Sequence, residues 1–137
     1  MAQQTSINIP THGRHTYEIT QAIERFVASS TISNGLCNIF CQHTSASLII
    51  SENADPDVQR DLDVFMAGLV HDGDPRFIHT MEGDDDMPAH IRSVLTATSL
   101  SVPIINHQLG LGTWQGIFLW EHRYASQNRH LTLTLID

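Results

Sequence analysis

The amino-acid sequence predicts an α+β fold, an antiparallel β-sandwich with about three helices in a single domain. Several short segments alternate apolar and polar residues, which is typical of antiparallel strands with one buried face. Other segments carry apolar residues at the three- and four-residue spacing of an amphipathic helix. The length of 137 residues allows one hydrophobic core.

The first part of the chain predicts strands around one short helix. The elements expected there are an N-terminal lead segment (1–13), a strand (15–19), a helix (21–28) and two strands (36–43 and 47–52). Thr20 precedes the helix and is expected to cap it. Ser-Asn-Gly at 33–35 separates the helix from the next strand.

Two further helices are predicted in the middle of the chain. Asp55-Pro56 starts the first, because Asp caps a helix and Pro at its first position loses no hydrogen bond. It is expected to reach about Val70 and to bury Val58, Leu62, Phe65, Met66 and Leu69. A polar loop over 71–86 leads to the second helix, which opens at Asp86-Met87-Pro88. Its expected buried residues are Ile91, Val94 and Leu95.

The last third of the chain predicts three strands. Their expected inward residues are Leu100, Val102 and Ile104 in the first, Ile117, Leu119 and Glu121 in the second, and Leu131, Leu133 and Leu135 in the third. Pro103 lacks a backbone N–H, so its strand is expected to lie at a sheet edge or to end its ladder there.

The charge balance excludes some classes of function. Asp and Glu number 15 against 7 basic residues, for a formal net charge of −8. All the basic residues are Arg, which excludes Schiff-base chemistry through lysine. A basic groove for nucleic acid is not expected, because binding phosphates requires clustered positive charge.

No targeting or membrane segment is expected, so the predicted location is the cytoplasm. No apolar run approaches the roughly 20 residues of a membrane span, and the N-terminus lacks the pattern of a secretory signal. Cys37 and Cys41 lie on one predicted strand, where their Cα atoms would be about 13 Å apart. A disulfide requires less than about 7 Å, so both thiols are expected to be reduced.

Histidine and aspartate are the residues that point to metal chemistry. His79 and His90 bracket four carboxylates, those of Glu82, Asp84, Asp85 and Asp86. Two imidazoles and a carboxylate suffice to hold a divalent transition metal ion. The alternative is a solvated acidic turn, in which Asp86 caps the helix and its acidic neighbours favour the helix dipole.

His43 is a third candidate ligand, at the end of a predicted strand where the core opens to a loop. Three histidines meeting there would leave a coordination position open, as catalytic zinc sites do. The alternative is a single hydrogen-bonded histidine. The hydroxyls of Thr44, Ser45 and Ser47, which follow, either orient a ligand or close the turn.

A glycine-rich loop and a buried acid complete the candidates. In Gly110–Gly116, Trp114 offers a stacking face and Gln115 an amide for a planar heterocycle, although a hairpin with a core Trp is the alternative. Glu121 falls on a buried strand face. A carboxylate there requires a partner, such as a metal ion, an Arg or a metal-bound His.

Three ordered motifs resemble the YjbQ-like family, which is also labelled the secondary thiamine-phosphate synthase family. They are His43-Thr-Ser-Ala-Ser-Leu-Ile-Ile-Ser-Glu-Asn53-Ala-Asp-Pro, His79-x-x-Glu82-Gly-x-x-Asp86-Met-Pro-Ala-His90, and Leu111-Gly-Thr-Trp114-Gln115-Gly-Ile followed by Glu121-His-Arg. The resemblance implies one YjbQ-like domain over 1–137, a homotrimer, a metal-containing pocket between subunits and a secondary thiamine-phosphate synthase activity. It also implies functional roles for Asn53 and Glu121.

The residues leave three functions open. The first is a transferase joining a pyrimidine pyrophosphate to a thiazole phosphate, with Mg²⁺ on Asp84–Asp86, phosphate on Arg76 or Arg92, and Trp114 stacking. The second is a hydrolase or lyase with Zn²⁺ on three histidines and Glu82 as general base. The third is a non-catalytic binder of metal or metabolite.

The expected site residues follow from these alternatives. The expected metal ligands are His43, His79 and His90; the expected catalytic residues are Glu82, Asp86 and Glu121; the expected substrate-binding residues are Ser45, Asn53, Trp114 and Gln115. The expected partners are a small molecule, which is phosphorylated in the transferase case, and further copies of the chain.

Overall fold

The strands form two antiparallel sheets, of five and three strands, in a computed structural model that describes residues 1–137. The elements are β1 (Ala2–Thr11), β2 (Thr16–Glu18), α1 (Thr20–Ser29), β3 (Gly35–Cys41), β4 (Ala46–Glu52), α2 (Pro56–Leu69), α3 (Asp86–Leu95), β5 (Ser99–Ile105), β6 (Gln108–Leu109), β7 (Gln115–Glu121) and β8 (Gln127–Ile136). The strand orders are β1-β8-β3-β5-β6 and β2-β7-β4. This architecture confirms the predicted α+β fold.

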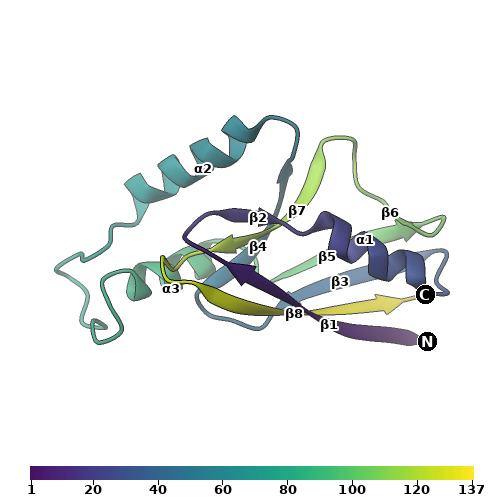
Figure 1. Cartoon of the computed structure of the whole chain (residues 1–137), viewed down its shortest axis with the longest axis horizontal. Coiled ribbons are helices and arrows are strands. Elements are labelled where there is room, and N and C mark those ends of the chain that lie inside the picture. The colour runs from purple at the N-terminus through teal and green to yellow at the C-terminus, as the bar shows by residue number, and fades with distance from the viewer.

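The hydrophobic core lies where the inward faces of the two sheets meet under α1. Cys37 and Ile39 of β3 and Leu133 of β8 come from the larger sheet, and Leu48 of β4 and Leu119 of β7 from the smaller one. All five are fully buried. Helix α1 packs onto this core, whereas α2 lies outside it (Figure 1) and contacts β7 through Met66.

Strand β7 is buried on both faces, not on the one face predicted. Ile117 and Leu119 join the main core, whereas Trp120 packs on the opposite face against Met66 and Val70, around the end of α2. The Trp120 indole N–H also donates to Asp63 at 3.1 Å. The central place of β7 in its sheet explains this, because β2 and β4 cover its edges and α2 covers its second face.

The N-terminal segment forms a strand that the sequence analysis did not predict. All ten residues of β1 pair with β8 in an antiparallel ladder. Only Ile7 and Ile9 of this edge strand pack against the core. A strand with so few apolar residues gives a weak alternation signal, and its pairing is defined by β8.

Two of the three predicted helix caps are corrected by the structure. Asp55 caps α2 as predicted, its carboxylate accepting from the Asp57 N–H at 2.9 Å. Ile19, not Thr20, precedes α1 and makes no side-chain cap. The Thr20 hydroxyl instead donates to Glu18 and accepts from the Ile117 N–H, because it faces the neighbouring sheet. Asp85, not Asp86, precedes α3.

The apolar side chains predicted to be buried in α3 largely face outward. Val94 is 81% exposed and Leu95 is 56% exposed, whereas Ala89, Arg92 and Ser93 are buried. The side chains on the inward face of α3 are therefore small or polar, and Asp86 lies on the same face. Exposed apolar residues occur on α2 too, where Phe65 is 68% exposed.

The prediction of two unpaired cysteines is confirmed. Cys37 and Cys41 are buried free thiols. Pro103 lies in β5, which is flanked by β3 and by the two-residue β6, so its strand is next to the sheet edge and not at the edge as predicted. None of the three helices combines the length and apolar character that spanning a membrane would need.

Candidate metal centre

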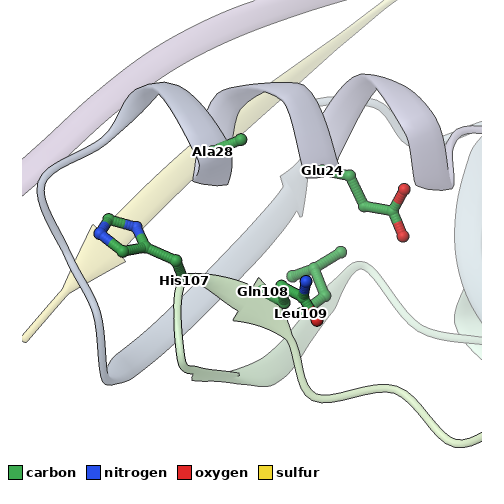
Figure 2. Close-up of a pocket in the computed structure, with 5 residues that line it drawn as sticks. All are labelled: Glu24, Ala28, His107, Gln108 and Leu109. Carbon is green, nitrogen blue, oxygen red and sulfur yellow. The ribbon is translucent and has the colours of Figure 1, made fainter.

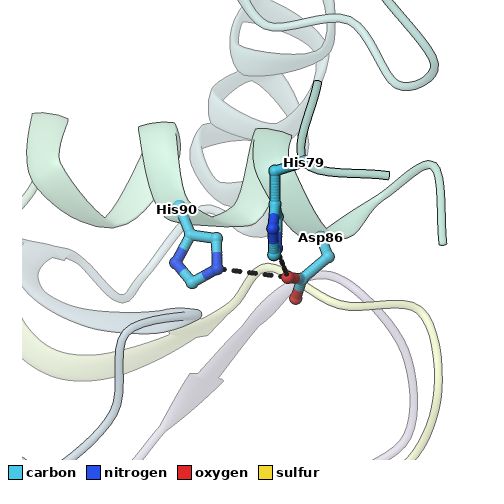
Figure 3. Close-up of side chains that lie close together, drawn as sticks. All are labelled: His79, Asp86 and His90. Carbon is cyan, nitrogen blue, oxygen red and sulfur yellow. Dashed lines mark hydrogen bonds and ion pairs between the residues drawn. The ribbon is translucent and has the colours of Figure 1, made fainter. Parts of the chain in front are cut away.

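Three side chains converge beside the first turns of α3. The Nε2 atoms of His79 and His90 lie 2.7 Å and 3.1 Å from the same oxygen, Oδ2 of Asp86 (Figure 3). Asp86 and His90 are four residues apart on α3 and share one helix face, whereas His79 comes from the preceding loop. One donor atom from each residue lies within 4.8 Å of the other two.

The Asp86 carboxylate is held as a buried anion. Its side chain is 3% exposed, and its second oxygen, Oδ1, accepts from Arg123 Nη1 at 2.6 Å. Burial alone would raise the pKa of Asp86, but the hydrogen bond with His79 and the positive charge of Arg123 lower it below its usual value. Asp86 is therefore ionised, as a metal ligand must be.

The donor set fits a divalent transition metal ion. Two imidazole nitrogens and one carboxylate oxygen are ligands that Zn²⁺ and neighbouring metals prefer, and three protein ligands leave positions open. The adjacent aspartates do not add to this set. Asp85 accepts from Arg123 Nε and from the Tyr124 N–H, and Asp84 is exposed.

The loop of residues 71–85, which carries His79, is tethered at both ends to the β7–β8 connection. At its start, Asp72 forms an ion pair of 2.8 Å with Arg14, which stacks over the Tyr124 ring and donates to the His122 carbonyl. At its end, Asp85 pairs with Arg123. The position of His79 therefore depends on two arginine contacts.

His43 lies outside this group of donors. Its Nε2 accepts a hydrogen bond from the His130 N–H at 2.7 Å, and the two imidazole rings stack 5.8 Å apart. Burial, Arg129 and His130 lower the pKa of His43. His43 is thus a neutral ring whose Nδ1 carries the proton, because the backbone N–H requires a lone pair on Nε2. Of the three predicted ligands, the structure brings His79 and His90 together, with Asp86 as the third.

His43 nevertheless lines the same cavity as His90, a member of the metal-capable group formed by His79, Asp86 and His90. A cavity of about 470 Å³ is lined by His43, Thr44, His90, Ser93, Val94, Thr96 and Thr98. A second cavity, of about 260 Å³, includes His79 and the carboxylates of Asp74 and Asp84 in its lining. A third, of about 360 Å³, lies between α1 and β6 (Figure 2) and contains none of the predicted site residues.

Glu82 lies close to the group, and Glu121 does not face it. Glu82 is exposed and lies four residues before Asp86, in the loop that leads into α3. Glu121 is fully buried and pairs with Arg129, which also donates to the carbonyl and hydroxyl of Ser45. The partner that a buried Glu121 requires is thus an arginine. Ser45 closes the turn before β4 in the same network.

The other predicted substrate residues lie at the opposite end of β7. Gln115 is six residues before Glu121 on this strand, a distance of about 20 Å at roughly 3.3 Å per residue. The Asn53 N–H donates to the Trp114 carbonyl, and the Gln115 amide oxygen accepts from the Gly112 N–H. These three residues form one cluster, in which Trp114 is 62% exposed. Within one chain this cluster is separate from the metal-capable group.

The arginines predicted to meet phosphate are already engaged. Arg76 forms a two-pronged ion pair with Asp74, and Arg92 is 2% exposed with one hydrogen bond, to the Val70 carbonyl. Arg123, which the sequence analysis did not select, is the arginine that contacts the group. The i,i+4 spacing of Asp86 and His90 was the available signal for the third ligand.

Comparison with known proteins gives one consistent result. The family model described as UPF0047 protein YjbQ-like matches residues 5–137. The UPF0047 protein sll1880 of Synechocystis is 52% identical over 128 residues, which are 93% of this chain and 87% of that protein. The UPF0047 protein YjbQ of Escherichia coli is 38% identical and covers 98% of both chains.

Solved structures agree with the sequence relatives. An uncharacterized conserved protein of the yjbq/upf0047 family from Clostridium acetobutylicum has a TM-score of 0.85 at 32% identity, covering 98% of this chain and 99% of its own. The conserved hypothetical protein TT1486 from Thermus thermophilus has a TM-score of 0.86 at 30% identity, covering 96% of this chain and 99% of its own.

Proposed function

Because the chain belongs to the UPF0047 family of YjbQ-like proteins and brings His79, Asp86 and His90 together, we propose that it is a metal-dependent enzyme acting on a small molecule. The observation that carries the proposal is the convergence of two imidazole nitrogens on one buried carboxylate oxygen. Unpaired acids are common on protein surfaces, but a buried aspartate facing two histidines is an arrangement suited to a cation.

The residues around the group have distinct roles in the proposal. When bound, a divalent ion would supply Lewis acidity to an oxygen of the substrate. Glu82, an exposed carboxylate of the loop that leads into α3, is the proposed group for exchanging a proton at that oxygen or at a water molecule. The cavity that His90 shares with His43 is the proposed binding place of the substrate.

Thiamine-phosphate synthesis is the transfer reaction that we propose to test first, because the sequence motifs resemble a family labelled with it. In that reaction a thiazole nitrogen displaces pyrophosphate from a pyrimidine carbon. With Arg76 paired and Arg92 buried, pyrophosphate would depend on the metal ion for its positive partner. The donor set itself favours a second candidate, a zinc-dependent hydrolase or lyase, since histidine nitrogen suits Zn²⁺ better than Mg²⁺.

Metal retention tests the proposal. We expect purified protein to hold about one transition metal ion per chain, and His90→Ala to lose it, because two remaining ligands bind weakly. Elemental analysis measures this, with His107→Ala as a control because that exposed histidine lies in the cavity between α1 and β6. Equal metal content in wild type and His90→Ala would disprove the assigned ligands.

Turnover separates the reactions. The wild type is expected to join pyrimidine pyrophosphate and thiazole phosphate, and His90→Ala to lose that activity. Turnover that needs added Mg²⁺ and survives in His90→Ala would place the transfer reaction elsewhere. A zinc-loaded protein with no transfer activity would favour the hydrolase or lyase.

We also propose that the working form is a homotrimer in the cytoplasm. Apolar side chains lie exposed around the metal-capable group, where Ile78 and Met81 are 97% and 98% exposed and Val94 is 81% exposed. Exposed apolar groups of this kind mark interaction surfaces, and the resemblance implies a homotrimer with the metal-containing pocket between subunits. The free thiols of Cys37 and Cys41 are in keeping with a reducing compartment.

Light scattering coupled to gel filtration tests the assembly. We expect a mass of three chains for the wild type and a smaller species for Val94→Glu, because a carboxylate would be buried in the interface. Val64→Glu on the exposed part of α2 provides a comparison at a second exposed valine. A monomeric wild type would contradict the proposal.

A further inference from the structure

Arg123 contacts three residues at the metal-capable group, one of which is the ligand Asp86. Its Nη1 donates to Asp86 Oδ1 at 2.6 Å, its Nε to Asp85 Oδ2 at 3.1 Å, and its Nη2 to the Glu82 carbonyl at 2.9 Å. One guanidinium therefore joins the first residue of α3, its N-cap residue and the loop that carries Glu82.

The two carboxylate oxygens of Asp86 have different partners because of the contact with Arg123. Oδ1 is occupied by Arg123, and Oδ2 faces both histidines. A carboxylate constrained in this way can offer a cation only one oxygen without losing a short charge-assisted hydrogen bond.

Arg123 is itself fixed from the core. Its backbone N–H donates to Glu121 Oε2 at 3.0 Å, and Glu121 is locked by Arg129. Its side chain is 18% exposed and its partner Asp85 also accepts from the Tyr124 N–H. The guanidinium is therefore a rigid support and not a mobile surface charge.

We propose that Arg123 is a positioning residue that restricts Asp86 to one-oxygen ligation and thereby sets the metal selectivity of the centre. The inference rests on the proposed metal site. Ca²⁺ takes six to eight oxygens and uses two-oxygen carboxylates, whereas Zn²⁺ is satisfied by about four nitrogen, sulfur or oxygen ligands. One carboxylate oxygen with two imidazoles favours the smaller, softer ion.

A substitution at Arg123 separates positioning from simple charge. Arg123→Met removes a positive charge next to a cation site, so electrostatics alone would strengthen binding of a divalent ion. A positioning role predicts weaker binding of the divalent ion, because Asp86 would turn freely and the loop carrying His79 would lose a tether. Losses of about 10- to 100-fold in metal affinity are typical when a residue that orients a ligand is removed.

The experiment is calorimetric titration of metal-free protein with Zn²⁺ and, separately, with Ca²⁺. The expected result for Arg123→Met is a 10- to 100-fold weaker Zn²⁺ affinity and a smaller ratio of Zn²⁺ to Ca²⁺ affinity, in keeping with the usual effect of such residues. Arg123→Lys is expected to fall between, since one ammonium can reach Asp86 but cannot also bridge Asp85 and Glu82. Arg76→Met is the matched control, because Arg76 is an exposed arginine in the loop that carries His79 and pairs only with Asp74.

The outcomes are distinguishable. Unchanged or tighter Zn²⁺ binding by a folded Arg123→Met protein overturns the inference and leaves the metal site standing. An equal loss in Arg76→Met would show that the effect is not specific to Arg123 and also overturns the inference. No Zn²⁺ binding by the wild type removes the proposed function and the inference together. If Arg123→Met does not fold, the selectivity ratio of Arg123→Lys decides, and an unchanged ratio overturns the inference.

Discussion

Replacing Arg129 by methionine is expected to lower the free energy of unfolding by about 3–5 kcal/mol, the usual cost of leaving one member of a buried ion pair alone. Glu121 is fully buried, and Arg129 is 4% exposed. Arg129 reaches both carboxylate oxygens of Glu121, and Thr11 donates to one of them at 2.6 Å. Without the guanidinium, Glu121 must either remain charged in the core or take up a proton. Urea denaturation followed by circular dichroism measures the loss.

The double variant tests whether the pair or the individual side chains matter. In Arg129→Met the carboxylate of Glu121 is left without its partner, and Glu121→Gln removes that charge. The double variant should therefore lose clearly less free energy of unfolding than the sum of the losses of the two single variants. Arg60→Met is the control, because Arg60 is 69% exposed and pairs only with its neighbour Asp61. A loss below about 1 kcal/mol in Arg129→Met, the range of exposed pairs, would contradict the expectation.

The second large expected effect is a loss of stability in mild acid, caused by His122. This side chain is fully buried, its Nε2 lies 2.8 Å from the Ser47 hydroxyl, and its Nδ1 has no partner in the protein. Burial, together with the charges of Arg92, Arg14 and Arg129, lowers the pKa of His122 to about 3. The neutral ring is therefore the form that the fold accommodates.

The direction of the pH effect follows from proton uptake. Between pH 6.5 and pH 3, the unfolded chain binds a proton at His122 that the folded chain does not, so the free energy of unfolding falls as the pH falls. The slope is about 1.4 kcal/mol per pH unit, which gives a loss of about 2 kcal/mol at pH 5. Above pH 6.5 the contribution of His122 is fully present and constant.

Urea denaturation at several pH values measures the slope, and His122→Gln isolates its source. Glutamine does not titrate, so the variant should lose less stability than the wild type between pH 6.5 and pH 4.5. His43, whose pKa is lowered in the same direction, remains in both proteins and cancels in the comparison. Parallel pH profiles for the two proteins would show that His122 is not the group responsible.

The fold could be predicted from the sequence where local signals carry the information. Asp55-Pro56 starts α2 because a cap and a first-turn proline act within a few residues. The alternation of Leu131, Leu133 and Leu135 marks the buried face of β8 directly. Strand β1 could not be predicted in the same way, since its ladder is supplied by a partner more than a hundred residues away.

The site was predictable to the extent that its ligands are close in sequence. His79 and His90 flank one loop, and Asp86 shares a helix face with His90, so a local segment holds the whole donor set. His43 was grouped with them because a strand end and a loop can meet, but its Nε2 is taken by the His130 N–H. The partner of Glu121 depends on how β7 approaches β8, which no local pattern contains. The outward turn of Val94 is likewise fixed by the polar contacts of Asp86 and Arg92 on the other side of α3.

The two arginine tethers of the loop over residues 71–85 have a consequence for how the protein opens. Both tethers end on the segment of residues 122–124, so releasing either end of the loop disturbs the same few residues. The loop and the β7–β8 turn should consequently open as one cooperative unit in hydrogen exchange, at a free-energy cost that both ends share.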